Sequence, residues 1–211
     1  MRALALPTHS RATLPVLLAA ALTVLALWFV FVPGAQAANL RLDGVKTTLT
    51  TNPATTTTLF TAGIIPLPVY PTPVVPTADA ARYSFPITGG KVDAKTLAGS
   101  IRHSGGILLA RRNADNTWTA LGLTRFTINI TKDPFLSAVV NGKDRASIAT
   151  LDLGSAKISK FTRHGRVFVK VANVAVTLNA TATGAINATF HTALPTEVPL
   201  GTATVLARVA R

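Results

Sequence analysis

The amino-acid sequence predicts an all-β domain, a β-sandwich of around ten mostly antiparallel strands with one short helix near the C-terminus. From residue 82 onward, short runs rich in Val, Ile, Leu, Phe and Thr are separated by Gly, Asn and Asp. These breaks recur at intervals of roughly ten residues, which is the strand spacing of sandwiches and barrels. Residues 179–190 are the one stretch whose apolar side chains recur near helical spacing.

The part of the domain before residue 82, residues 38–81, is predicted to hold a first strand and a long loop. The strand is expected at residues 40–49. Residues 64–76 carry five prolines. Proline has no backbone N–H and cannot donate to a central strand ladder. We therefore expect a surface loop that joins the first strand to the main body, residues 82–211, within the same single domain.

The main body contains two local signals for a change of chain direction or phase. Residues 97–102 and 107–111 flank His103-Ser104-Gly105-Gly106, a composition typical of a hairpin turn. Within residues 118–130 the apolar positions change parity, which predicts a β-bulge near Thr124-Arg125.

Residues 167–178 and 200–209 show the clearest alternation. Two runs of alternating apolar residues flank Ala172-Asn173, so a hairpin would place six apolar side chains on one face. A single bulged strand is the alternative. Residues 200–209 are predicted as the closing strand, with Ala203, Val205, Ala207 and Val209 on one face.

The N-terminus predicts export. A short basic start is followed by an uncharged apolar run over residues 14–32, then by Pro33-Gly34 and by Ala35-Gln36-Ala37. This order is that of a signal peptide, residues 1–37, cleaved near Ala37. The alternative is an uncleaved anchor, because the run approaches the roughly 20 residues that span a bilayer. Either way, we expect an extracytoplasmic protein, secreted or associated with the cell envelope.

Charge indicates the kind of partner. The formal net charge is +13, and the chain has no cysteine, which excludes a disulfide scaffold or a thiolate metal site. Export argues against nucleic acid, and the basic residues are scattered with no aromatic pair interleaved among them. We expect anionic wall polymers or lipid headgroups as partners, with simple solubility as the alternative reading of the charge.

Motifs for catalysis are missing from the sequence. His103, His164 and His191 share no metal-ligand spacing, and there is no nucleophile elbow, phosphate loop or dinucleotide fingerprint. A non-catalytic protein is therefore expected. His103 is the candidate site residue, because a histidine in an exposed loop can ligate a metal or haem iron; a polar turn residue is the alternative.

Residues 83–90 (YSFPITGG), 97–106 (LAGSIRHSGG) and 126–130 (FTINI), followed by AVVNG at 138–142, resemble the HtaA-type domain of secreted and surface-anchored actinobacterial proteins. The resemblance covers roughly residues 40–209 and implies the fold and an extracytoplasmic location. Members of that family that bind haem use an axial Tyr from an early strand and a nearby His. His103 falls on the His-x-Gly position, whereas residues 45–60 contain no Tyr.

These observations predict an exported, envelope-associated, non-catalytic binding protein. The alternative is a binder of haem or of a small hydrophobic ligand that uses the loop around His103. Tyr83, which lies beside the Phe-Pro pair and not at the family's ligand position, is the second candidate ligand-binding residue.

Overall fold

A computed structural model describes residues 39–211. The predicted signal peptide, and its alternative as a retained anchor, lie outside the described residues. The described residues form one compact unit. Among the described residues, no helix is both long enough and apolar enough to span a membrane.

The described chain is mostly strand. Its elements in order are β1 (Asn39–Thr51), α1 (Pro53–Thr61), β2 (Ile65–Val69), β3 (Val74–Pro76), β4 (Ala81–Asp93), β5 (Gly99–His103), β6 (Gly106–Arg112), β7 (Trp118–Ile130), β8 (Phe135–Val140), β9 (Arg145–Asp152), β10 (Lys157–Arg163), β11 (Arg166–Leu178), α2 (Ala180–Phe190) and β12 (Val198–Val209). The all-β class and the short C-terminal helix, α2, are confirmed.

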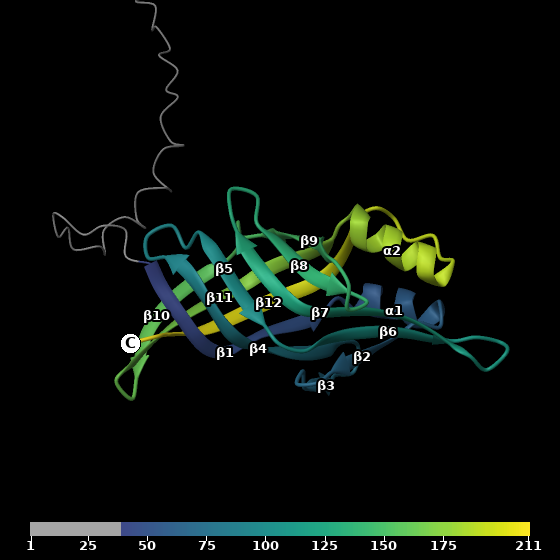
Figure 1. The fold of residues 1–211 in the computed structure, drawn as a ribbon, viewed down its shortest axis with the longest axis horizontal. Coiled ribbons are helices and arrows are strands. Elements are labelled where there is room, and N and C mark those ends of the chain that lie inside the picture. The colour runs from purple at the N-terminus through teal and green to yellow at the C-terminus, as the bar shows by residue number, and fades with distance from the viewer. Residues whose placement is uncertain (1–38) are drawn as a thin grey trace, which may run out of the picture. The chain divides into compact units, whose positions relative to one another are not determined.

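The strands form one sheet that closes on itself. Its twelve strands pair antiparallel throughout. Eight of them follow one another in an order that runs from β7 through β5, β4, β1, β12, β11 and β9 to β8. Pairing of β8 with β7 completes a ring. The apolar side chains on the inner face of this ring pack across it as the two inner faces of a sandwich do. Both helices lie at one end of the ring, and the tip of the β10–β11 hairpin lies at the other (Figure 1).

The predicted hairpin at residues 103–106 is wrong. β5 and β6 pair with the same edge of β7, β5 with residues 127–130 and β6 with residues 118–124. Both run antiparallel to β7, so the chain continues in one direction through Ser104-Gly105 instead of turning back. β4 borders β5 on the other side, and β2 borders β6. His103 is therefore the last residue of β5, one of the strands that form the ring, and does not lie in a turn.

The predicted hairpin over residues 167–178 is also wrong, and its alternative is confirmed. β11 is a single strand whose register against β12 shifts between Val171 and Val174, and Asn173 has a φ of 61°. The bulge changes the parity, so the apolar residues on both sides of it still face inward. The bulge predicted near Thr124-Arg125 is confirmed by the register shift of β7 against β8 and by the φ of 50° at Arg125.

The Thr- and Pro-rich segment contains more structure than a loop. Asn52 caps α1 by accepting a hydrogen bond from the amide of Ala54, and Pro53 occupies the first turn, where no N–H is required. β2 pairs with β6, and β3 pairs with β4. Both of these proline-bearing strands lie at the margin of the sheet, where their missing donors cost little.

Candidate ligand cavity

A cavity of about 130 Å³ lies inside the ring. Every strand of the ring contributes to its lining, which is almost wholly apolar. Its few polar members include Thr47 on β1, Tyr83 on β4 and His103 on β5. The structure thus brings both predicted site residues, His103 and Tyr83, to the same cavity. Leu153 marks the place where the lining reaches the surface, since its side chain is 37% exposed.

His103 is held inside the ring by two hydrogen bonds. It is 5% exposed, so it does not stand at an exposed loop tip as predicted. Its Nδ1 lies 3.2 Å from the carbonyl oxygen of Phe126, which can only accept, so Nδ1 carries the proton. Its Nε2 then accepts from the hydroxyl of Thr47, 2.7 Å away. The two contacts fix one neutral tautomer and use both ring nitrogens.

The backbone that follows His103 keeps its imidazole pointing into the cavity. The amide of Ser104 donates to the carbonyl of Pro86, 3.0 Å away, which keeps β5 against β4 to its end. Gly105 has a φ of +80°, and a Cβ there would lie 2.1 Å from the hydroxyl oxygen of Thr72. Glycine therefore lets the chain pass straight into β6 without displacing His103.

Burial sets the protonation state of His103. Desolvation disfavours the imidazolium and lowers the pKa of His103 to about 4, although the hydrogen bond to the Phe126 carbonyl acts in the opposite direction. The side chain is therefore neutral at pH 7. It behaves as a polar member of the core and carries no charge for an anionic ligand.

Tyr83 is equally enclosed. Its side chain is 2% exposed, and its hydroxyl donates to the carbonyl of Pro66, 2.9 Å away. The ring stacks on Phe85 with centroids 6.5 Å apart, and Phe85 meets Phe126 edge to face at 4.9 Å. Burial raises the pKa of the Tyr83 phenol. Tyr83 therefore contributes an aromatic wall to the cavity, with its hydroxyl engaged by the backbone.

Thr47 is the site residue that sequence reasoning missed. It lies on β1 beside Leu49 in an alternating strand, and nothing in its immediate sequence distinguishes it from the other threonines nearby. Its role depends on His103, which is 56 residues away. Thr47 places a hydroxyl on the early strand, facing the histidine, in the region where the resemblance implies an axial Tyr.

Comparison with solved structures agrees with this architecture. The C-terminal domain of HtaA from Corynebacterium glutamicum superposes with a TM-score of 0.53 at 14% identity, covering 81% of this chain and 99% of that domain. The haem-binding protein HtaB from the same organism superposes with a TM-score of 0.50 at 12% identity, covering 82% and 96%. The chain has the HtaA-type fold. No family model and no curated protein sequence matches it.

The HtaA-type fold raises the question whether the cavity suits haem. Of the side chains that line it, His103 and Tyr83 are those that can ligate iron. Both are already hydrogen-bonded within the protein, at 2.7 Å and 3.2 Å for the two nitrogens of His103 and at 2.9 Å for Tyr83. No Lys or Arg lines the cavity to meet a propionate. The donor set of this arrangement does not fit a haem iron.

The described part of the chain offers no other site for a metal ion. Among residues 39–211, no group of three or more His, Asp or Glu side chains is placed to hold a metal ion. Among the same residues, no buried side-chain nitrogen or oxygen lacks a hydrogen-bond partner. What the HtaA-type fold offers here is an apolar space that reaches the surface near Leu153 and whose polar atoms are already satisfied.

Proposed function

We propose that this chain is an exported, non-catalytic binding protein of the cell envelope, and that it holds a small apolar ligand inside its closed sheet. The observation that carries the proposal is the apolar cavity of about 130 Å³ to which every strand of the ring contributes. An engineered apolar cavity of about 150 Å³ stays dry and binds benzene, so the volume suits a ligand of a few heavy atoms or one end of an aliphatic chain.

The polar residues of the lining support an apolar ligand. Thr47, His103 and Phe126 form a closed chain of hydrogen bonds, and Tyr83 is bonded to Pro66. A polar ligand would need these groups to break their present bonds, at a cost of about 1–3 kcal/mol for each buried group left unpaired. An apolar ligand requires no such exchange and gains from burial alone.

The proposal is tested with benzene and hexane as probes of residues 38–211. At ten times its Kd, a bound probe stabilises the protein by about 1.4 kcal/mol, which raises the Tm by roughly 3–6 °C for a domain of this size. Ala203 lines the cavity, and Ala203→Leu should fill it and abolish the rise. Ala110 is equally buried but does not line the cavity, so Ala110→Leu should destabilise the protein and keep the rise.

Hemin is the matching probe for a haem ligand. The ligand atoms of His103 and Tyr83 are already hydrogen-bonded within the protein. We therefore do not expect hemin to give a shifted Soret band that depends on His103. A His103-dependent Soret band would replace the proposed apolar ligand by haem. If no probe raises the Tm, or if Ala203→Leu and Ala110→Leu respond alike, the cavity is not a binding site.

A further inference from the structure

The hairpin formed by β10 and the first half of β11, residues 157–172 and hereafter the ribbon, borders the ring, and its tip lies at the end opposite the helices (Figure 1). Within the described chain β10 pairs with β11 alone, so the other edge of β10 is free. Every residue of β10 is exposed. β10 is therefore accessible along its free edge, whereas the β11 half of the ribbon is partly covered and pairs with β12.

The ribbon concentrates positive charge. It carries five basic residues, which are Lys157, Lys160, Arg163, Arg166 and Lys170, and no acidic residue occurs between Asp152 and Glu197. The strand register places Arg163 directly opposite Arg166. Among the ion pairs of residues 39–211, the ribbon takes part only through Arg166, which lies 4.0 Å from Asp43, and Asp43 is itself held by Arg208 at 2.5 Å. Most of the charge is therefore not neutralised within the domain.

Apolar side chains lie among these charges. Phe161 pairs with Phe168 across the ribbon, and their rings stack with centroids 5.4 Å apart and an interplanar angle of 11°. Phe161 remains 42% exposed and Ile158 remains 54% exposed. The expectation that no aromatic pair interleaves with the basic residues is therefore wrong, because the register brings together residues that the sequence separates.

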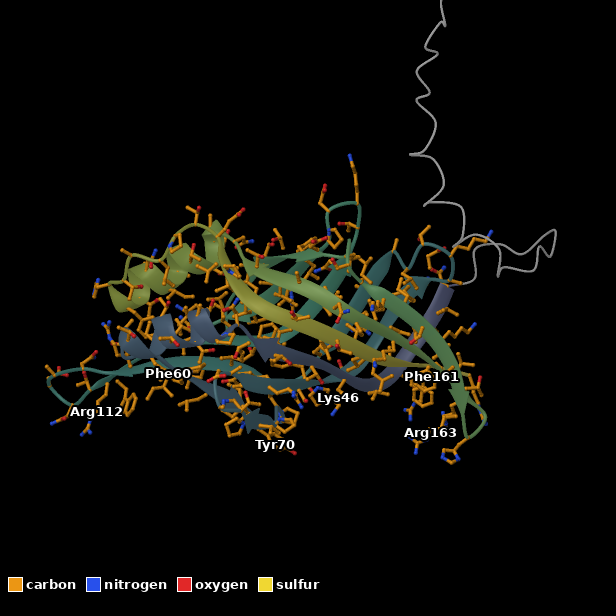
Figure 2. All side chains as sticks on the ribbon, turned by 180° about the vertical axis from the view of Figure 1, so that it is seen from behind. Lys46, Phe60, Tyr70, Arg112, Phe161 and Arg163 are labelled. Carbon is orange, nitrogen blue, oxygen red and sulfur yellow. The ribbon has the colours of Figure 1, made fainter. Side chains whose placement is uncertain are left out.

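The ring extends the same surface. Lys170 on β11 and Lys46 on β1 both pair with Leu206 of β12, so their side chains lie in one row on the outer face of the sheet. Figure 2 shows Phe161, Arg163 and Lys46 on the same side of the molecule. Because successive side chains of a strand point to opposite faces, Lys157, Phe161 and Arg163 of β10 lie on this face. Their neighbours Arg166, Phe168 and Lys170 on β11 lie on the same face, whereas Ile158 and Lys160 point to the other one.

We infer that the ribbon docks the domain on an anionic lipid membrane. A bilayer with anionic lipids attracts each nearby Lys or Arg, and the exposed Phe161 side chain gains by entering the boundary between headgroups and acyl chains. A soluble polyanion satisfies the charges but offers nothing to Phe161. A second copy of the chain would pair with the free edge of β10, where Lys157 and Lys160 repel it. The inference is independent of the cavity ligand.

The test uses residues 38–211 and vesicles of phosphatidylcholine with or without phosphatidylglycerol. Binding is expected only to the vesicles that contain phosphatidylglycerol, and it should weaken steeply as salt is raised. Each basic residue near an anionic surface contributes a factor of about five, so Lys157→Gln with Arg163→Gln, two residues on the face of Phe161, should weaken binding about 25-fold. Lys132→Gln with Lys143→Gln removes two exposed lysines from loops of the ring and should change it less than twofold.

Insertion is read out by tryptophan fluorescence. Trp118 is the tryptophan of the described residues, so Phe161→Trp in a Trp118→Phe background gives a reporter on the ribbon. Anionic vesicles should shift its emission to the blue, and brominated lipid should quench it. Three results overturn the inference: equal losses in the two double variants, equal binding to neutral vesicles, or binding to soluble polyphosphate as tight as to vesicles with no emission shift.

Discussion

Acidification tests the environment assigned to His103. The folded protein holds the pKa of His103 at about 4, because burial disfavours the charged ring, whereas the unfolded chain has the ordinary value of 6.5. Well above pH 6.5 His103 is neutral in both the folded and the unfolded protein, so its burial does not lower the free energy of unfolding there. As the pH falls below 6.5, the unfolded chain takes up a proton that the folded protein refuses, so the free energy of unfolding decreases. The loss amounts to about 3 kcal/mol by pH 4 and levels off at about 3.4 kcal/mol below it.

The measurement is urea denaturation between pH 7.5 and pH 4. Wild type should lose the full amount across this window, whereas His103→Gln, which has no titrating group at this position, should show a profile flatter by about 3 kcal/mol. His164→Gln is the matched control, because it removes an exposed imidazole far from the cavity and should keep the acid loss. Parallel profiles for wild type and His103→Gln would refute the buried neutral histidine.

Two aspartates titrate at and below the acid end of this window. Hydrogen bonds from Thr96 lower the pKa of Asp93, and those from Thr117 lower the pKa of Asp115. A carboxylate with a lowered pKa stabilises the folded state above its unfolded value of 3.8, and that contribution is lost as the pH falls through the folded value. These losses begin at the acid end of the His103 window and do not imitate it.

Four further substitutions test local structure by urea denaturation at pH 7. Thr47→Val removes the donor to His103 Nε2 and should cost about 1–3 kcal/mol; a loss under about 0.5 kcal/mol contradicts the assigned tautomer. Asn179→Ala removes the cap that accepts from the amide of Ala182 at 3.1 Å and should cost about 1 kcal/mol; an unchanged midpoint rules the cap out. Gly184→Ala adds a methyl group to open space in α2 and should stabilise by about 0.8 kcal/mol. Gly99→Ala, where the Cβ would lie 2.0 Å from a backbone oxygen at a φ of +147°, should instead destabilise, and equal effects of the two would refute the described backbone.

The sequence predicts the features that depend on local alternation. α2, the bulge in β7 and the inward face of β12 follow from the spacing of apolar residues within a single element. The same reasoning predicts a hairpin in this part of the chain, but it places the turn at the wrong pair of residues. Ala172-Asn173 is a bulge with a positive φ at Asn173, whereas the tight turn is His164-Gly165, whose φ values of 49° and 68° suit a two-residue hairpin. Asn and Gly signal both structures, so composition alone does not separate them.

The cavity and its contacts depend on distant residues. His103-Ser104-Gly105-Gly106 reads as a turn because a hairpin and a straight passage between two partner strands need the same glycines. The Thr47 contact joins β1 to β5, and the ribbon's aromatic stack joins Phe161 to Phe168 through the register. The cavity exists because the side chains of all the ring's strands together do not fill the interior. No single segment of the sequence therefore predicts it.

The passage from β5 to β6 also determines where the chain tolerates changes of length. Ile101, His103, Ile107 and Leu109 are all buried, so the inward parity continues unbroken across Ser104-Gly105. One residue inserted there would turn either His103 or the apolar residues of β6 toward solvent. The exposed turns at residues 113–117 and 141–144 carry no such constraint. Homologues of this chain should therefore differ in length at those turns, and a peptide tag should be accepted there and rejected between β5 and β6.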